Sequence, residues 1–320
     1  MKTISIGKLR GLQQCTSPQG TFTSLALAHR QNLRRALSPQ DPSRVTDGEL
    51  SSFKLDVISN LAKFATAVLL DPEVSAAQAI ATGCLPGQVG LVVALESTGY
   101  NGIPTARQSQ VLPDWSVQKA KRMGASMVKL LVYYHPQSPT ASEIEDFVRL
   151  ISEECSRFDL GLMLEPLSYS LEEGTSLSSA EKRYVVTETA RRLVVPGVDI
   201  LKSEFPLDVH SGEDEKSWAD AWAEISSASP VPWILLSAAV DYASFLRQVL
   251  VACQAGAAGI AVGRAVWQQA VGLKGSERSA FLHASARERL TQLNELCSRN
   301  ARPIQSFYSA EAPFGWYKKY

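Results

Sequence analysis

Two lysines of this sequence lie in apolar segments where buried strands are expected. Lys202 lies in segment 198–204 and Lys129 in segment 127–131. Burial of a lysine is costly unless its charge is paired or the amine loses its proton, and a neutral amine is a nucleophile toward carbonyl carbon. Lys202 is therefore a candidate imine-forming residue. The alternative is an ordinary surface lysine at a strand end.

A nucleophilic lysine needs a lowered pKa and groups that move protons. A shift of about three units from the ordinary lysine pKa corresponds to about 4 kcal/mol. Burial and a second ammonium group supply such a shift, and Lys129 is the candidate for that group. Glu165 and Glu204 are candidate catalytic acid/base residues. Because Lys202 and Glu204 are two positions apart, their side chains should share one face of a strand.

A second chemical pattern consists of small and basic residues near the carboxyl end of the chain. Ser237 follows one apolar run, and Gly263 with Arg264 follows the next. Glycine lets backbone amides approach an anion, and arginine provides a charged, forked donor. These three residues predict a phosphate site, with an ordinary strand-to-helix turn as the alternative.

The elements that must position these residues are eight short apolar runs. They cover residues 23–28, 67–70, 90–95, 127–132, 161–164, 198–201, 232–236 and 258–262. The runs are continuous, as in parallel strands covered on both faces, and helical patterns such as 179–193 separate them. The sequence predicts an α/β fold, a (β/α)8 TIM barrel spanning residues 1–273. An open doubly wound sheet is less favoured because no Gly-x-Gly-x-x-Gly follows the first run.

Reactive groups of such barrels lie at the carboxyl ends of the strands. The polar residues at these ends are His29, Arg30, Asp71, Glu96, Lys129, Glu165, Lys202, Glu204, Ser237, Gly263 and Arg264. We expect them to meet in one mouth, where His29, Arg30 and Glu96 are further candidates for substrate contact.

The composition of the chain bears on its partners, its cellular setting and its relation to membranes. The formal net charge is zero, which gives no reason to expect a nucleic-acid partner or an anionic membrane. Five scattered cysteines without a CxxC pair predict neither a disulfide framework nor zinc, and they favour a reducing, cytoplasmic setting. No apolar run approaches membrane-spanning length. His135, His210 and His283 lack metal-ligand spacing and are expected to be solvated.

The last part of the chain, residues 274–320, differs from the barrel pattern. A charged helical pattern covers 276–296 and is followed by an aromatic tail. The tail holds Phe307, Tyr308, Phe314, Trp316, Tyr317 and Tyr320. We expect it either to pack on the barrel or to contact a second subunit of a homo-oligomer.

Several segments together resemble the tagatose 1,6-bisphosphate aldolase group of class I Schiff-base aldolases, which includes the sulfofructosephosphate aldolases. The matching segments are 26–30, 69–73, 96–100, 128–134, 164–166, 199–206, 236–238 and 263–267. The resemblance implies a barrel without metal or cofactor that cleaves a ketose phosphate into dihydroxyacetone phosphate and an aldehyde such as glyceraldehyde 3-phosphate. It implies tagatose 1,6-bisphosphate or a related ketose 1-phosphate as substrate.

The resemblance also implies roles for single residues. Lys202 would form the imine with Lys129 as its partner, and Glu165 would be the acid/base residue. The phosphate would be bound by Ser237, Gly263 and Arg264.

One position departs from this family. Ala28 precedes His29 and Arg30 where the family usually has aspartate. Glu96, Glu165 or Glu204 could take over the role of that carboxylate. Alternatively, the substrate differs, for example a sulfofructose phosphate that gives sulfolactaldehyde, or the protein is a non-catalytic sugar-phosphate-binding regulator. A deoxyribose-phosphate-type Schiff-base aldolase is a further alternative.

Overall fold

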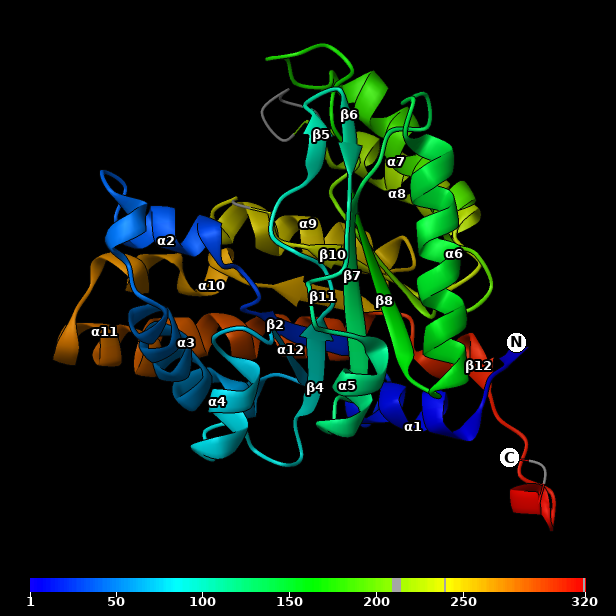
Figure 1. Ribbon diagram of the computed structural model, residues 1–320, viewed down its shortest axis with the longest axis horizontal. Helices are drawn as coiled ribbons and strands as arrows, with labels where there is room; N and C mark the ends of the chain where they lie inside the picture. Colours follow the sequence, from blue (N-terminus) through cyan, green and yellow to red (C-terminus); the bar gives the residue numbers. More distant parts are fainter. Residues whose placement is uncertain (209–213, 239, 319) are drawn as a thin grey trace.

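The protein folds as a closed barrel of eight parallel strands surrounded by helices, as Figure 1 shows. The computed structural model describes residues 1–208, 214–238, 240–318 and 320. The barrel strands are β2 (Phe22–Ala26), β3 (Ala67–Leu70), β4 (Gly90–Ala94), β7 (Met127–Tyr133), β8 (Gly161–Leu167), β9 (Ile200–Ser203), β10 (Trp233–Leu236) and β11 (Gly259–Val262). Each of these strands overlaps one predicted apolar run, so the predicted barrel is confirmed.

The other elements form the helical layer and small additions at both ends of the barrel. The helices are α1 (Ile6–Gln14), α2 (Gln31–Leu37), α3 (Asp47–Leu61), α4 (Ala76–Ala81), α5 (Val117–Arg122), α6 (Ala141–Arg157), α7 (Ser179–Leu193), α8 (Glu215–Ala228), α9 (Tyr242–Gln254), α10 (Arg264–Trp267), α11 (Gly275–Phe281) and α12 (Arg287–Asn300). Two further strand pairs are β1 (Lys2–Thr3) with β12 (Tyr308–Ser309) and β5 (Asn101–Ile103) with β6 (Ala106–Gln108).

The core fills the barrel and the layer between strands and helices. Every residue of β2, β3, β4, β9, β10 and β11 is buried, which is why their sequences are continuous rather than alternating. Trp222 of α8 stacks on Trp233 of β10 with ring centroids 4.5 Å apart. Trp267 is also buried, so the tryptophans of this region are packing groups.

The register of the central strands places the reactive side chains. Leu164 of β8 pairs with Leu201 of β9, so the next residues, Glu165 and Lys202, lie level on adjacent strands. Leu131 of β7 pairs with Glu165, so Lys129 lies two residues deeper in the barrel. Because side chains alternate along a strand, Lys129 and Leu131 point to the same side.

Local sequence fixes the helix that follows β8. Ser178 accepts a hydrogen bond from the Glu181 backbone, and the Glu181 carboxylate accepts one from the Ser178 backbone. Such a capping box satisfies orphan amides and stabilises a helix start by about 1 kcal/mol. It fixes the start of α7 at the predicted residue 179 and places Lys182 near the mouth of the barrel.

The amino end of the barrel is closed by α1. Lys8 Nζ donates to Asp199 Oδ2 at 2.8 Å and to the Gly197 carbonyl at 3.0 Å. Tyr308 donates its hydroxyl to the Asp199 carbonyl, so both ends of the chain meet beside β9. The contacts at this end of the barrel are structural. They lie away from the carboxyl ends of the strands, where we predicted the reactive residues.

A hairpin that the sequence analysis did not anticipate stands beyond the carboxyl end of β7. Strands β5 and β6 pair antiparallel between β4 and α5, at the top of Figure 1. The Arg107 guanidinium lies over the rings of Tyr100 and Tyr169, 4.5 Å from each centroid. Cation–π contact therefore fixes the hairpin to the loop that follows β8.

The segment after residue 273 has two parts. Its helical part covers the barrel: α12 packs on β2 and α9, with Leu290, Leu293 and Cys297 buried. A π-helical turn, Leu282–Ala286, joins α11 to α12. The tail beyond β12 projects from the body, and Phe314 and Tyr317 are exposed (Figure 1). The domain boundary at 273 and a role for the tail in a second subunit stay predictions.

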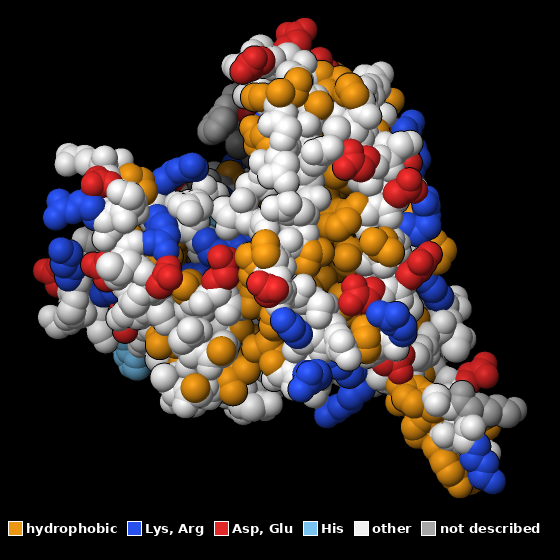
Figure 2. All heavy atoms as spheres, in the orientation of Figure 1, with side chains coloured by type: hydrophobic (Ala, Val, Ile, Leu, Met, Phe, Trp, Pro, Cys, Tyr) orange, Lys and Arg blue, Asp and Glu red, His pale blue; other side chains and the backbone are white. Residues whose placement is uncertain are grey.

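The face shown in Figure 2 carries acidic and basic side chains that are interspersed, while apolar side chains gather on the projecting tail at the lower right. This mixture agrees with a formal net charge of zero. Among the described helices, none combines the length and apolar character that a membrane crossing needs.

Candidate active site

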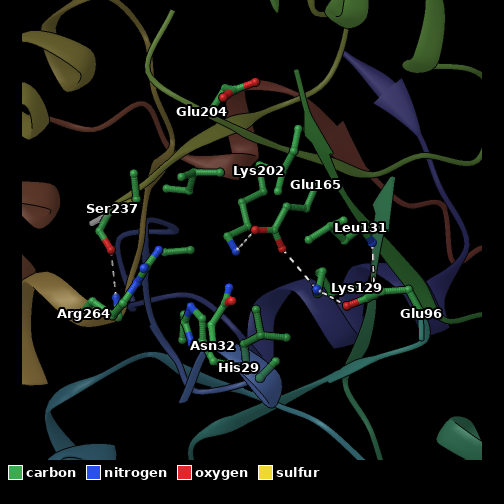
Figure 3. A pocket seen from close by; sticks show the side chains of 18 of the residues that line it. His29, Asn32, Glu96, Lys129, Leu131, Glu165, Lys202, Glu204, Ser237 and Arg264 are labelled. Carbon is green, nitrogen blue, oxygen red and sulfur yellow. Dashed lines mark hydrogen bonds and ion pairs between the residues drawn. The ribbon is translucent and has the colours of Figure 1, made fainter. Parts of the chain in front are cut away.

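A cavity of about 380 Å³ opens at the carboxyl ends of the barrel strands. All ten predicted site residues line it: His29, Arg30, Glu96, Lys129, Glu165, Lys202, Glu204, Ser237, Gly263 and Arg264 (Figure 3). Asp71 does not line it, and its expected place in the mouth is wrong. Its carboxylate is fully buried against Lys54 of α3 and accepts a hydrogen bond from the Val74 amide at 2.8 Å.

One side of the cavity holds four charged groups, Lys202, Glu165, Lys129 and Glu96, which we call the charged cluster. Lys202 Nζ lies 2.6 Å from Glu165 Oε1, and Lys129 Nζ lies 3.2 Å from Glu165 Oε2. Lys129 also donates to Glu96 Oε1. Each of the four residues is less than 10 % exposed. Figure 3 shows their side chains and the contacts that join them. The two lysines thus share one carboxylate, and Lys129 has a second one.

This arrangement gives the two amines opposite pKa shifts. Burial lowers the pKa of Lys202, and the positive charge of Lys129 lowers it further, against the opposing pull of Glu165. Burial also acts on Lys129, but Glu165 and Glu96 outweigh it and raise the pKa of that amine. Burial opposes the charge of Glu165, yet Lys129 and Lys202 lower its pKa to about 2. Lys202 is therefore the amine that loses its proton more easily.

Arg30 and Glu96 were predicted to contact substrate, and both are engaged within the protein. Glu96 Oε2 accepts a hydrogen bond from the Leu131 amide at 3.0 Å. The Arg30 guanidinium donates to the Glu96 carbonyl at 3.0 Å and pairs with Glu73. Their direct contact with a substrate stays a prediction.

Glu204 lies apart from the charged cluster. Strand β9 ends at Ser203, and the Glu204 carboxylate accepts a hydrogen bond from the Ser168 amide at 2.6 Å. Figure 3 shows this carboxylate turned away from the Lys202 amine. The expectation that Lys202 and Glu204 act side by side on one strand face is wrong, because the chain leaves the strand between them. A catalytic role for Glu204 stays a prediction.

The opposite side of the cavity, which we call the anion side, is formed by Ser237, Gly263, Arg264 and His29. The Gly263 amide donates to Ser237 Oγ at 3.1 Å, which joins the ends of β10 and β11. A side chain at position 263 would approach the Ala26 carbonyl within 2.8 Å, so glycine is required there. The Arg264 Nε has no hydrogen-bond partner among the described residues. Its donor is available to an anion.

His29 completes the anion side as a neutral ring. Burial and the positive charges of Arg264 and Lys202 lower the pKa of His29 to about 3. Its ring contacts Trp267 edge-on with centroids 5.6 Å apart, and its Nδ1 has no hydrogen-bond partner among the described residues. A neutral imidazole can donate to or accept from a hydroxyl group of a ligand without adding charge.

Comparison with known proteins agrees with this geometry. A model of the DeoC/LacD family aldolases matches residues 41–269. The chain belongs to the DeoC/LacD aldolase family. A tagatose 1,6-diphosphate aldolase of Enterococcus faecalis is 31% identical and is covered over 96% of its length by 94% of this chain. One of Lactococcus lactis is 30% identical, with 92% of this chain and 97% of the relative covered. The predicted resemblance is confirmed.

Solved structures confirm the barrel of this family member. An archaeal fructose 1,6-bisphosphate aldolase has a TM-score of 0.60 at 23% identity, covering 91% of this chain and 99% of that one. A fructose-bisphosphate aldolase of Plasmodium falciparum has a TM-score of 0.72 at 12% identity, covering 94% and 98%. At these identities the likeness concerns the fold alone.

Sequence reasoning missed several residues that line the cavity of this DeoC/LacD family member, among them Asn32, Tyr133 and Lys182. For Tyr133 a signal existed, because positions 129, 131 and 133 alternate on one strand and share a face. Asn32 and Lys182 belong to the first turns of α2 and α7, and their position depends on how each helix packs after its strand.

The remaining histidines of this family member differ from one another. His135 is buried, and its Nδ1 accepts a hydrogen bond from the Gln137 amide at 3.1 Å, so the expectation of a solvated residue is wrong for it. His283 is exposed on the surface, as expected. His210 lies outside the described residues. Among the residues that the structure describes, no three His, Cys, Asp or Glu side chains form a group that could hold a metal ion.

Proposed function

We propose that the protein is a class I (Schiff-base) aldolase that cleaves a ketose 1-phosphate, tagatose 1,6-bisphosphate or a related sugar, into dihydroxyacetone phosphate and an aldehyde. One observation carries the proposal: the Lys202 amine has a lowered pKa and lies 2.6 Å from Glu165, inside a cavity that also holds Lys129. The names of the Enterococcus faecalis and Lactococcus lactis relatives support the choice of substrate.

The first half of the reaction forms the imine. The neutral Lys202 Nζ attacks the ketone carbon, the carbonyl oxygen takes up a proton from water, and the amine gives up one of its own protons, which leaves a carbinolamine. Loss of that oxygen as water leaves a protonated imine on Lys202. Glu165 is placed to accept the proton that the amine gives up and to return it to the leaving oxygen, because it is the carboxylate that contacts Lys202.

The second half breaks the carbon–carbon bond. A base removes the proton of the hydroxyl group on the far carbon of the bond that breaks, which is C4 when the imine is at C2, and that carbon becomes the aldehyde. The bonding pair moves into the protonated imine and gives an enamine. Protonation of the enamine carbon and addition of water release dihydroxyacetone phosphate and restore Lys202. The positive charges of Lys129 and Lys202 favour the ionised form of Glu165, which is therefore ready to accept a proton.

The anion side of the cavity is assigned to the phosphate. Arg264 offers a charged donor without a partner among the described residues, and Ser237 offers a hydroxyl group. Helix α10 is only four residues long, so we assign the attraction to the guanidinium rather than to a helix dipole. His29 lies beside this site and is assigned to a substrate hydroxyl group.

The proposal needs neither metal ion nor cofactor, since Lys202 supplies the electron sink after imine formation. Its partner is a free sugar phosphate in a reducing, cytoplasmic setting. A homo-oligomer in which the aromatic tail contacts a second subunit is compatible with the exposure of Phe314 and Tyr317.

Borohydride trapping with dihydroxyacetone phosphate tests the proposal. The native protein should gain the mass of one reduced adduct, and peptide mapping should place it on Lys202. Lys202→Ala should lose the adduct and lower turnover by about 10³-fold or more, whereas Lys121→Ala, a change on the exposed surface, should keep both. Absence of an adduct on the native protein would disprove the proposal.

A substrate panel then separates the alternatives. Tagatose 1,6-bisphosphate, sulfofructose phosphate and deoxyribose phosphate are compared by kcat/KM. The proposal expects tagatose 1,6-bisphosphate to be preferred over the other two compounds. Ligand-induced thermal stabilisation without cleavage of any member would instead favour a sugar-phosphate-binding regulator. Ala28→Asp, measured on the same panel, reports whether the usual family carboxylate changes the preference.

A further inference from the structure

We infer that Glu96 is a positioning residue that decides which of the two lysines in the cavity is the nucleophile. The inference rests on the proposed function, because it concerns the imine-forming amine. It gives Glu96 a role that requires no contact with substrate.

The two amines resemble each other in burial and in their contact with Glu165. Lys129 and Lys202 are 3 % and 5 % exposed, and both contact Glu165. Glu165 is in fact nearer to Lys202, at 2.6 Å, than to Lys129, at 3.2 Å. With Glu165 alone, Lys202 would be the better-paired cation. The contact between Lys129 and Glu96 reverses this order.

Glu96 is held beside Lys129, and its remaining ion pair is the longer one to Arg30 Nη2, at 3.8 Å. Its Oε1 accepts from Lys129 and its Oε2 accepts from the Leu131 amide at 3.0 Å. Its carbonyl accepts from Arg30 Nη2 at 3.0 Å, and Arg30 is anchored in turn by Glu73. Both carboxylate oxygens are therefore engaged, and Glu96 is 4 % exposed. This rigid placement distinguishes a positioning residue from a group that meets the substrate.

Removal of the Glu96 charge should exchange the roles of the amines. With one carboxylate left for two buried ammonium groups, one of them loses its proton. The nearer partner of Glu165, Lys202, then keeps its proton, and Lys129 becomes neutral. The charged or titratable groups that face this pair are Glu165 from β8, Glu204 after β9, His29 and Arg30 after β2, Tyr133 from β7, Lys182 from α7 and Arg264 from α10.

Limited reductive methylation with formaldehyde and cyanoborohydride measures the neutral fraction of each amine. The ratio of Lys202 to Lys129 labelling, read by peptide mass as a function of pH, is an internal comparison within one protein. In the native protein Lys202 should be labelled in excess at pH 7. In Glu96→Gln the ratio should fall by about tenfold or more, and labelling of Lys202 should need a pH at least about one unit higher.

Trapping with dihydroxyacetone phosphate is run in parallel on both proteins. Glu96→Gln should form the Lys202 adduct slowly at pH 7 and recover it at higher pH. Glu96→Asp keeps the carboxylate and should restore most of the labelling ratio. Glu215→Gln changes a carboxylate outside this chain of contacts, which pairs with Arg247 on the exposed surface, and should leave the ratio unchanged.

The outcomes of these experiments distinguish a failure of the proposed aldolase function from a failure of the role assigned to Glu96. Failure of the native protein to trap dihydroxyacetone phosphate on Lys202 would remove the proposed function itself. An adduct on native Lys202, together with an unchanged labelling ratio in Glu96→Gln, would overturn the role of Glu96 alone. A pH-independent loss of labelling on both amines in Glu96→Gln would also count against it, since that result indicates a merely structural role.

Discussion

The two sides of the cavity satisfy their polar groups in different ways. In the charged cluster, each of Lys202, Glu165, Lys129 and Glu96 has at least one partner of opposite charge. On the anion side, the Arg264 Nε and His29 Nδ1 have no hydrogen-bond partner among the described residues. Both sides are built from side chains at the ends of neighbouring parallel strands, so the fold alone does not explain the contrast.

The contrast indicates that the charged cluster sets the pKa values of the catalytic groups, whereas the anion side binds the ligand. The charged cluster sets the protonation of its own members through fixed contacts, before any ligand binds. The anion side offers donors that a ligand can use, and desolvation of unpaired donors makes such a contact worth more than it would be in water. We therefore expect substitutions in the charged cluster to change kcat and pH dependence, and substitutions on the anion side to change KM.

The largest effect is expected from Glu165→Gln. Both lysines lose their shared partner, so proton transfer during imine formation is impaired and kcat should fall by about 10²–10⁴-fold, with a small change in KM. Stopped-flow or coupled-assay kinetics measure both constants. The free energy of unfolding should fall by up to about 3 kcal/mol, because two buried amines lose a counter-charge.

Glu215→Gln serves as the matched control for that substitution. It removes a carboxylate that pairs with Arg247 on the surface, where both side chains are about half exposed. Stability should change by less than about 1 kcal/mol, and kcat should stay the same. Equal losses of kcat in the two variants would contradict the distinction between the charged cluster and ordinary ion pairs.

Arg264→Gln should have an intermediate effect that is confined to binding. Loss of a charge-assisted contact to phosphate should raise KM by about 10–100-fold and leave kcat within about threefold. The native protein should trap dihydroxyacetone phosphate much better than dihydroxyacetone, and the variant should discriminate less between them. Arg247→Gln, on the exposed surface, is the control. A retained preference for the phosphorylated ketone in Arg264→Gln would place the phosphate elsewhere.

The smallest effect is expected from His29→Gln, and it concerns how the free energy of unfolding depends on pH. The lowered pKa of His29, about 3, keeps the ring neutral in the folded protein, whereas the unfolded chain takes up a proton near pH 6.5. The contribution of the neutral ring to stability is thus complete above about pH 6.5 and is lost as the pH falls toward 3. His29→Gln should lose less stability than the native protein between pH 7 and pH 4 in urea unfolding. A steeper loss in the variant would show that His29 is protonated in the fold.

Much of the barrel could be predicted from the sequence because buried parallel strands have a simple pattern. Each of the eight apolar runs overlaps a strand, and helix α7 begins at the predicted Ser179 because its capping box is local in sequence. The β5–β6 hairpin could not be predicted, since its three-residue strands are not apolar and its anchor, Arg107, contacts residues distant in sequence.

The sequence predicted which residues line the cavity, but it predicted only part of how they are arranged there. The sequence order assigns Lys202, Glu165 and Lys129 to strand ends, and the closure of the barrel brings them together. Asp71 has the same position in the pattern, yet it turns to Lys54 because α3 supplies a buried amine behind β3. Glu204 faces Ser168 because β9 ends one residue before it.

The sequence by itself determined the class of fold, the family and the identity of the reactive groups, because each depends on residue type and on spacing along the chain. Only the tertiary structure decided which partner each charged group has. The pKa of Lys202 relative to that of Lys129 depends on distances of a few ångströms to Glu165 and Glu96. Such distances arise when residues 33 to 37 positions apart in the sequence come together on neighbouring strands.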